Sequence, residues 1–381
     1  MKHLTMSIIG GGIAGLCTAL ALQNRGIRAE VFEASPKLEP VGAGLGLGAN
    51  AMLAFKELGI YDDVVQIGKS LPSFTLYDHL GKRISHTQFD PNDTIGSFTI
   101  HRANLHELLL SRLDPAQIHL GKRVVKYQAE DFSVSLTFDD GSTHITNYLI
   151  VADGIHSAVR QTLLPASVPR YSGYTCWRAV IDNTSLKISQ SSETWGSKGR
   201  IGLVPLPDNL LYWFICINAK KGDLKHYGVK ELSSRFDQYH APIPQVLAAT
   251  DDHQLIHNDI IDLKPLSQFA FGRTVLIGDA AHATTPNMGQ GACQAIEDAV
   301  VLGQCVEKIT DTEEAFRLFE KRRLGRTRWI VDTSWRLGKA AQLENGLLIG
   351  LRNAALRSLP PSVNNRQLDK IKTVDFLSNT N

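Results

Sequence analysis

The chain has 381 residues, which is long enough to bury a large core and predicts two domains or one domain with a substantial insertion. Its 40 basic and 38 acidic residues leave a formal net charge of +2, and this balance argues against an overall basic surface of the kind that binds nucleic acid. No apolar run approaches the roughly 20 residues of a membrane span, and five scattered cysteines without a Cys-x-x-Cys pair favour reduced thiols in a cytoplasmic protein over a disulfide framework or a zinc site.

The first thirty-three residues predict a strand, a glycine-rich turn, a helix, a second strand and an acidic residue. A buried strand at residues 6–9 leads into Gly10-Gly11-Gly12-Ile13-Ala14-Gly15. A helix of apolar period then ends near Gly26, and a strand at residues 29–32 stops at Glu33. This order within about thirty residues is typical of a dinucleotide-binding unit.

Each part of that unit has a physical role in holding a dinucleotide. Gly10 permits the tight turn, Gly12 lets a pyrophosphate approach the backbone, and Gly15 lets the helix pack closely on the strand. The amides at the helix N-terminus favour the anionic phosphates, and Glu33 can accept hydrogen bonds from a ribose. A secretory signal peptide is the alternative interpretation, but four glycines within six residues would break its apolar helix.

A second glycine-rich run, residues 41–48, would let the backbone lie against a planar group or form a sharp loop. Asn50 is expected to cap a helix that ends at Gly59. A hairpin is expected from residues 74–77 and 83–89, and a helix from residues 103–113.

Two further strands, at residues 134–138 and 144–151, flank Asp139-Asp140-Gly141, which is a strong hairpin signal. The second strand leads into Asp153-Gly154 and on to Arg160. From about residue 167 to residue 268 strand-like runs dominate, at residues 174–181, 200–204 and 210–217, with one clear helix at residues 229–239. This β-rich insertion is the natural place for the wall of a substrate pocket.

A sequence pattern typical of a dinucleotide-binding domain occurs again near the C-terminus. A buried strand at residues 273–277 leads into Gly278-Asp279 and, further on, Gly289-Gln290-Gly291, where a helix begins. The tail from Glu313 is expected to be helical, with eight basic residues between positions 317 and 339. We interpret these basic residues as a solvated helix face, with a membrane or nucleic-acid patch as the alternative.

Together, three separated motifs resemble one family, the single-component FAD-dependent aromatic hydroxylases, or class A flavoprotein monooxygenases, with similarity to members that act on urate or salicylate. Residues 10–15 with Glu33 look like the FAD-binding fingerprint of the family. Asp153-Gly154 through Arg160 look like its second motif, and residues 278–291 like its third. Because order and spacing agree, the resemblance covers the chain to about residue 335.

The resemblance implies an α/β fold: a Rossmann-like FAD-binding domain of the glutathione-reductase type, as in p-hydroxybenzoate hydroxylase, with an inserted β-sheet substrate domain and C-terminal helices. The FAD-binding domain would comprise residues 1–73, 98–166 and 269–335. The substrate domain would comprise residues 74–97 and 167–268, and a helical tail residues 336–381.

The family resemblance also implies the cofactor chemistry. FAD is the expected cofactor, and NAD(P)H is the expected co-substrate, which would visit transiently because the chain has one dinucleotide fingerprint. The hydroxylating species would be a flavin C4a-hydroperoxide, formed with O2 and shielded from water. No metal is expected.

The third motif fits a flavin chemically. Asp279, at the end of a predicted strand, can accept a hydrogen bond from a ribityl hydroxyl group. Residues 289–291 begin a helix whose amides and positive end would stabilise an anionic reduced flavin. Pro286 has no amide proton and can therefore stand beside the flavin face. His282 is expected to be packed or hydrogen-bonded.

The resemblance assigns a set of residues to the cofactor site: Gly10, Gly12, Ile13, Ala14, Gly15, Glu33, Ala34, Gly44, Arg102, Val125, Asp153, Gly154, Arg160, Gly278, Asp279, Pro286, Gly289, Gln290, Gly291 and Ala292. A surface cation at a helix start is the alternative for Arg102. Cys293 departs from the family pattern, in which Asn is common at this position, and a thiol is a poor hydrogen-bond donor.

Arg200, Tyr212 and Pro286 are the candidate catalytic residues. Strand alternation predicts that Arg200 and Tyr212 project into one pocket if their strands pair. The arginine would bind an anionic ring or carboxylate, and the tyrosine would orient the substrate or exchange a proton with it, as in members that act on urate. The alternative is an edge arginine and a core tyrosine.

The favoured function is a FAD-dependent monooxygenase that hydroxylates an aromatic or heteroaromatic small molecule. Same-fold oxygenases acting on tetracycline-like or quinone-precursor substrates are the first alternative. A flavin halogenase lacks its expected Trp-x-Trp-x-Ile-Pro signature here. A FAD-binding protein without turnover is the alternative from a different functional class. No stable membrane association is expected.

Overall fold

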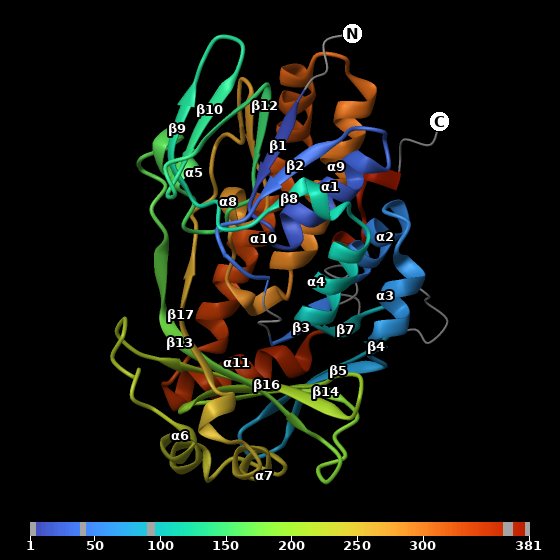
Figure 1. Ribbon diagram of the computed structural model, residues 1–381. Coiled ribbons are helices and arrows are strands. Elements are labelled where there is room, and N and C mark those ends of the chain that lie inside the picture. The colour runs from blue at the N-terminus through green and yellow to red at the C-terminus, as the bar shows by residue number, and fades with distance from the viewer. Residues whose placement is uncertain (1–4, 39–42, 90–95, 361–368, 378–381) are drawn as a thin grey trace.

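The computed structural model describes residues 5–38, 43–89, 96–360 and 369–377, and it is built around two large sheets (Figure 1). We call the six-stranded sheet the parallel sheet, because its strands run parallel in the order β19-β12-β1-β2-β8 and β18 pairs antiparallel at the edge. Its strands are β1 (Met6–Ile9), β2 (Ala29–Phe32), β8 (Ile118–His119), β12 (Tyr148–Val151), β18 (Ala270–Phe271) and β19 (Thr274–Leu276).

Helices pack against the parallel sheet because its strands are apolar on both faces. All four residues of β1 and all four of β12 are buried, which is the pattern of a parallel sheet covered on both sides. Helix α1 (Ile13–Gln23) connects β1 to β2 and packs on α9 (Gly291–Lys308), so that the first and third motifs meet. The predicted strand–turn–helix–strand unit and the Rossmann-like architecture are confirmed.

The hairpin predicted over residues 134–151 is only half right. Strand β10 (Val134–Phe138) pairs with β11 (Thr143–Thr146) and with β9 (Val124–Ala129) in a small antiparallel sheet. The chain changes sheets at Asn147, whose Oδ1 accepts hydrogen bonds from the backbone and side chain of Thr5, and it continues as β12 beside β1.

The seven-stranded sheet, which we call the large sheet, has the order β17-β13-β16-β15-β14-β5-β6. The predicted hairpin of β5 (Ser73–Asp78) and β6 (Arg83–Gln88) is confirmed. The long strands are β13 (Arg170–Asp182), β15 (Gly199–Pro205) and β16 (Leu210–Asn218). Strands β14 (Ser191–Gly196) and β17 (Ile256–Asp262) were missed, because neither has a clear apolar alternation.

The two faces of the large sheet have different environments. Trp177, Trp213 and Ile215 belong to the outer face, which packs against α6 (Val229–Phe236) and α7 (Ile243–Ala248) in an apolar core. The opposite face, which we call the inner face, carries Tyr174, Cys176, Arg178, Arg200, Tyr212, Phe214 and Cys216. In Figure 1 the inner face is the upper face of the large sheet and points toward the rest of the molecule.

A small sheet of β3 (Gly44–Leu47), β7 (Phe98–His101) and β4 (Gly68–Ser70) lies between the two large sheets, with helices α2 (Ala49–Glu57), α3 (Tyr61–Ile67) and α4 (Arg102–Ser111) beside it (Figure 1). Residues 41 and 42 of the second glycine-rich run lie outside the described residues. The prediction that Asn50 caps α2 is wrong: Gly48 occupies the N-cap, and the Asn50 side chain bonds to Gln290 and Glu297.

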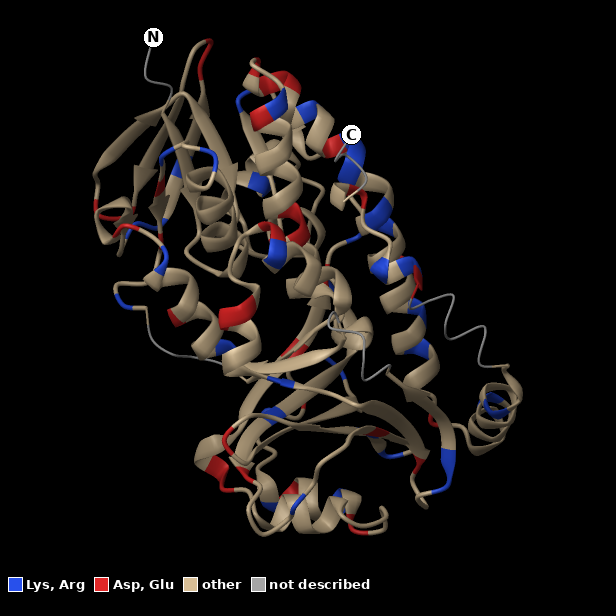
Figure 2. Cartoon of the chain, turned by 90° about the vertical axis from the view of Figure 1, so that its right-hand side faces the viewer, with Lys and Arg blue, Asp and Glu red and all other residues tan. Residues whose placement is uncertain are grey.

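The C-terminal part is helical as predicted, with α10 (Thr312–Ala341) and α11 (Gly346–Ser358). The short helix α5 (Ala158–Leu163) follows β12 in the second motif, and the short helix α8 (Asp279–His282) follows β19 in the third motif. Figure 2 shows basic residues along α10, but several do not form a solvated face. Arg323 is fully buried against Glu297 and Asp298, and Arg326 pairs with Glu297. Within the described residues, no helix combines the length and apolar character needed to cross a membrane.

Candidate active site

The three motifs converge at the carboxyl edge of the parallel sheet. Ile9 pairs with Phe32 on one side and with Val151 on the other, and Val151 pairs with Leu276. The residues that follow these strand ends therefore share one edge of the sheet: Gly10, Glu33, Ala152, Asp153, Gly278 and Asp279. Ligands of open α/β sheets bind at this edge.

The glycines of the first motif have two different roles, because two of them allow close backbone packing and one borders open space. An added Cβ at Gly15 would lie 1.9 Å from the carbonyl oxygen of Gly10, and one at Gly10 would lie 2.2 Å from that of Ala152. By contrast, a Cβ at Gly12 would meet no atom within 4 Å. Gly10 and Gly15 therefore serve close backbone packing, while Gly12 borders the open space that a pyrophosphate would fill.

Glu33 is held in place by two backbone amides. Its Oε2 accepts a hydrogen bond from Gly11 N at 2.6 Å, and its Oε1 accepts one from Ser35 N at 2.7 Å. Each carboxylate oxygen keeps a second acceptor site. The carboxylate is thus fixed beside the glycine turn, with the capacity to accept ribose hydroxyls. Ala34 lies between these two contacts and is half-buried.

The second motif contains a carboxyl group in an unusual environment. Burial raises the pKa of Asp153 to about 6, and its Oδ1 is buried without a hydrogen-bond partner within the described part of the chain. Gly154 has a φ of +84° and borders open space. Arg160 is fully buried and donates to the carbonyls of Ile155 and Ala280, so that it ties the second motif to the third and has no surface for direct contact with a ligand.

Asp279 has the environment of a side chain that lines a recess. It is solvent-exposed, yet the surrounding protein atoms raise the pKa of its carboxyl, against the lowering effect of His282 and Arg102. The field of Arg102, which begins α4, therefore reaches Asp279 from a distant part of the chain. The sequence prediction that both line one cofactor site remains a proposal that this arrangement supports.

A buried charge network holds the third motif. Asp298 Oδ2 accepts hydrogen bonds from Gly278 N at 2.8 Å and from His282 Nε2 at 2.6 Å, while Oδ1 accepts one from Arg323 Nε at 2.6 Å. Burial acts to raise the pKa of Asp298, but the interactions with His282 and Arg323 bring it below its usual value. His282 is therefore packed and hydrogen-bonded, as expected, and the network fixes the turn that presents Asp279.

Hydrogen bonds to other parts of the chain also fix the start of α9. Gly289 adopts the left-handed conformation with a φ of +63° and borders open space, and Gln290 exchanges hydrogen bonds with Asn50. Cys293 makes three contacts that bridge this turn to the second glycine-rich run, because its Sγ accepts from Gly48 N and reaches the carbonyl oxygens at positions 46 and 289. The thiol thus keeps a bridging role in spite of its weak donor strength.

The remaining cofactor candidates have the following places. Ile13 and Ala14 start α1, Gly44 starts β3, Val125 lies 57% exposed on β9, Gly291 and Ala292 start α9, and Pro286 is exposed at the start of a short 3-10 helix. Gly278 has a φ of +55°, and an added Cβ there would lie 2.8 Å from that of Ala14. The first and third motifs are therefore in direct contact.

Arg200 and Tyr212 lie on the same face of one sheet, as strand alternation predicts. Strands β15 and β16 pair antiparallel, so that Arg200 is opposite Cys216 and Tyr212 is opposite Val204, with Phe214 between them along β16. An added Cβ at Gly44 would lie 2.6 Å from the Tyr212 Cβ. The inner face therefore approaches the second glycine-rich run at Tyr212.

That Arg200 binds an anionic ring or carboxylate stays a prediction, and the structure adds that protein groups already engage its guanidinium. Its Nη1 forms an ion pair with Glu193 Oε1 at 2.8 Å, its Nη2 donates to Asn287 Oδ1, and only 3% of the residue is exposed. The sequence prediction missed Glu193 because a polar, short strand carries it, and it missed Asn287 because that residue lies within a motif whose other members carried the argument. Tyr174 also donates to Asn287 Oδ1, at 3.2 Å.

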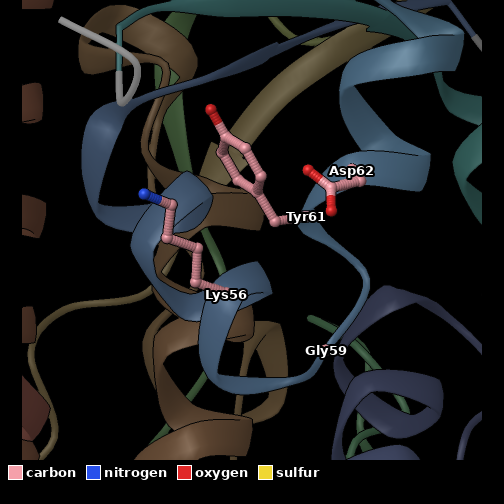
Figure 3. A pocket seen from close by; sticks show the side chains of 4 residues that line it. All are labelled: Lys56, Gly59, Tyr61 and Asp62. Atoms are coloured by element: carbon pink, nitrogen blue, oxygen red, sulfur yellow. The ribbon is translucent and has the colours of Figure 1, made fainter.

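A separate pocket of about 490 Å³ is lined by Lys56, Gly59, Tyr61 and Asp62, where α2 leads into α3 (Figure 3). In Figure 3 the Lys56 and Tyr61 side chains extend in the same direction from the backbone, and the Lys56 Nζ is 4.8 Å from the centre of the Tyr61 ring. None of these four residues belongs to the three motifs, so we do not assign the active site there.

The residues present fit FAD. Open space beside Gly12, Gly154 and Gly289, a fixed carboxylate at Glu33 and a recessed carboxylate at Asp279 match the pyrophosphate, ribose and ribityl requirements of a dinucleotide. Among the residues that the structure describes, no group of three or more His, Cys, Asp and Glu side chains gathers as a metal-ligand set.

Comparison with known proteins gives concordant results. A family profile described as FAD binding domain matches residues 3–323. The aurachin C monooxygenase/isomerase of Stigmatella aurantiaca is 37% identical over 361 residues, covering 93% of this chain and 94% of that protein. The 2-heptyl-3-hydroxy-4(1H)-quinolone synthase of Pseudomonas aeruginosa is 31% identical over 373 residues, with 96% of each covered. The crystal structure of Klebsiella pneumoniae HpxO complexed with FAD and uric acid has a TM-score of 0.89 at 29% identity and covers 97% of each chain.

Proposed function

Because the chain belongs to the FAD binding domain family and is a FAD-dependent monooxygenase, we propose that it hydroxylates a bicyclic heteroaromatic compound of the 4(1H)-quinolone type. With NAD(P)H as reductant, FAD supplies the activation of O2 and the insertion of one oxygen atom into an aromatic ring. The observation that carries the assignment is the convergence of three motifs at one sheet edge, opposite an inner face with aromatic residues.

The residues of the chain divide the work of holding the cofactor. The amides that follow Gly12 would bind the pyrophosphate at the N-terminus of α1, and Glu33 would accept the ribose hydroxyls. Asp279 would accept a ribityl hydroxyl. The positive end of α9, an eighteen-residue helix, would stabilise negative charge on the flavin ring, and Pro286 would border that ring.

The substrate class follows from the relatives and from the chemistry of the inner face. The name of the Pseudomonas relative describes a 4(1H)-quinolone with a heptyl chain at position 2 and a hydroxyl group at position 3. Tyr212 and Phe214 offer aromatic surface for such a ring system, with their ring centres 6.1 Å apart. The pairing of Arg200 with Glu193 favours a substrate of low net charge at that point of the face.

A purine substrate is the second candidate, because the HpxO structure was determined with uric acid at a TM-score of 0.89 to this chain. We further propose a cytoplasmic location, since all five cysteines are free and buried thiols.

The test is turnover by the purified protein with NADH or NADPH, using 2-heptyl-4(1H)-quinolone, urate and salicylate in parallel. NAD(P)H consumption, peroxide release and product mass are measured together. We expect the quinolone to stimulate NAD(P)H consumption and to gain one oxygen atom, labelled when 18O2 is supplied. Absence of stimulation, or recovery of all the reducing equivalents as peroxide, would contradict the proposed substrate.

A further inference from the structure

The inner face of the large sheet carries one arginine on each side of Phe214, and the two arginines differ in the protein groups that they contact. Phe214 pairs with Arg178 on β13 and with Gly202 on β15, two residues along the strand from Arg200. The Arg200 guanidinium lies 6.0 Å from the centre of the Phe214 ring. Both arginines therefore border the aromatic surface that faces the third motif.

The charge of Arg200 is satisfied by the protein itself. Glu193 neutralises it, and Asn287 accepts from its second terminal nitrogen. With 3% of the residue exposed, Arg200 has almost no surface left for a ligand. Its contacts instead connect the large sheet to the short 3-10 helix Pro286–Met288 in the third motif.

Arg178 differs in each of these respects. Its one hydrogen bond to a side chain, within the described ranges, runs from Nη2 to Asn258 Oδ1, which is a neutral acceptor. No carboxylate of the described residues forms an ion pair with it. Its Nε, like that of Arg200, is buried without a partner among the same residues, but the Arg178 side chain is partly exposed and can therefore be reached by a ligand. A buried, unpaired donor on a cationic group is costly, and a ligand oxygen would remove that cost.

The aromatic rings beside Arg178 are fixed by glycines. Val180, two residues beyond Arg178, pairs with Tyr212, so that Tyr212 stands diagonally to Arg178. An added Cβ at Gly202 would lie 2.1 Å from the Phe214 ring, so that the ring occupies the space above this glycine. A planar ligand that packs on Tyr212 and Phe214 would present an edge to the Arg178 guanidinium.

We propose that Arg178 binds an anionic or strongly polarised ring oxygen of the substrate, such as the 4-oxo oxygen of a 4(1H)-quinolone, and that Arg200 is a positioning residue for the third motif. This inference rests on the proposed function. A planar guanidinium with several donors suits an oxygen at the edge of a ring better than the point charge of a lysine does.

The test uses the oxidised FAD-loaded protein and a matched pair of probes, 2-heptyl-4(1H)-quinolone and 2-heptylquinoline, which lacks the oxygen. Binding is measured without NAD(P)H by the change in flavin absorbance. We expect the unmodified protein to prefer the quinolone, and Arg178→Met to weaken quinolone binding by about ten- to a hundredfold while binding of 2-heptylquinoline is unchanged. Arg178→Lys should recover part of the preference.

The controls separate recognition from folding. Arg328→Met changes an exposed arginine of α10 and should leave both dissociation constants unchanged. FAD content of Arg178→Met should match the unmodified protein, because Arg178 belongs to none of the three motifs, and thermal unfolding should show only the small loss expected from the hydrogen bond to the neutral Asn258 Oδ1. Retention of the full quinolone preference in Arg178→Met would overturn the inference.

Failure of the proposed function is recognised separately in the unmodified protein. If it hydroxylates none of the quinolone, urate and salicylate, both the function and the inference fall. If urate is the compound hydroxylated, the same variants are compared with urate, and the KM should rise by about ten- to a hundredfold in Arg178→Met but not in Arg328→Met. An unchanged KM would overturn the role of Arg178 and leave the oxygenase assignment intact.

Discussion

Arg200 and Glu193 form a buried ion pair on neighbouring strands of the large sheet, with 2.8 Å between Nη1 and Oε1. The same oxygen of Glu193 accepts a hydrogen bond from Trp195 Nε1 at 2.8 Å. The arginine continues to Asn287 in the third motif. The pair therefore links the floor of the proposed substrate site to the segment expected beside the flavin, and its charge is balanced before any ligand binds.

Removal of both partners should destabilise the protein by less than the sum of the two single removals. Arg200→Met leaves the Glu193 carboxylate buried without its cation, and we expect the free energy of unfolding to fall by about 3–5 kcal/mol. The double variant with Glu193→Met should lose less than the sum of the single variants. Urea unfolding of the four proteins at one saturating FAD concentration measures this difference, and strict additivity would contradict the coupling.

Gly12→Val should abolish FAD binding. The added side chain would enter the open space that the pyrophosphate requires. The ratio of flavin absorbance to protein absorbance after purification is the measurement. Gly325→Ala, in the middle of α10 and also without atoms within 4 Å of an added Cβ, is the matched control and should retain FAD. A yellow Gly12→Val protein with full flavin content would refute the role of the first motif.

Asp279→Ala should weaken FAD binding by roughly ten- to a hundredfold, since a hydrogen bond to a charged group is worth about 1.5–3 kcal/mol. Its recessed carboxylate is the proposed acceptor for a ribityl hydroxyl. Titration of the apoprotein with FAD, followed by quenching of flavin fluorescence, gives the dissociation constant. Asp237→Ala, on an exposed residue after α6, serves as the control, and equal affinities of the two variants would place Asp279 outside the cofactor site.

Tyr212→Phe should lower turnover more than it lowers substrate binding. Burial raises the pKa of Tyr212, so its hydroxyl stays protonated at neutral pH and can donate a hydrogen bond to the substrate. The ring would still pack against Gly44, which should preserve most of the affinity. Steady-state kinetics with the identified substrate test this split between kcat and KM. An unchanged kcat would show that the hydroxyl group does not act in the reaction.

The stability of the apoprotein should depend on the protonation of Asp153. Its pKa is raised from 3.8 to about 6, so the folded protein binds this proton more tightly than the unfolded chain does. The stability contribution is therefore fully present below pH 3.8 and is lost as the pH rises through about 6. Above this pH the buried, charged carboxylate lowers the free energy of unfolding by roughly 3 kcal/mol.

Asp153→Asn should remove this pH dependence. The variant should gain stability over the unmodified apoprotein, and the gain should grow between pH 5 and pH 8, as measured by urea unfolding at each pH. A gain that is constant across this range would assign the effect to a cause other than the titration of Asp153.

The parts of the site that are local in the chain could be predicted from the order and spacing of their residues. The unit from β1 to Glu33 is contiguous, so glycine spacing and apolar periodicity specify its conformation without distant partners. The three separated motifs were assigned to one site through their resemblance to a family, and the structure shows the physical reason, which is that the ends of parallel strands meet at one edge of a sheet. Strand alternation likewise identified the shared face of Arg200 and Tyr212.

The partners that complete the site depend on how the chain folds. Asn50 has the sequence context of a helix cap, yet it bonds to Gln290, 240 positions away. Glu193 and Arg200 are only seven positions apart, but their ion pair depends on the antiparallel pairing of β14 with β15, and the polar sequence of β14 does not predict that strand. Periodicity specifies the face on which a side chain lies, but the partner of a polar group depends on which strands pair and on which distant segments pack together. The ion pair of Arg200, and the neutral Asn258 that takes the place of a carboxylate beside Arg178, therefore became visible only in the folded chain.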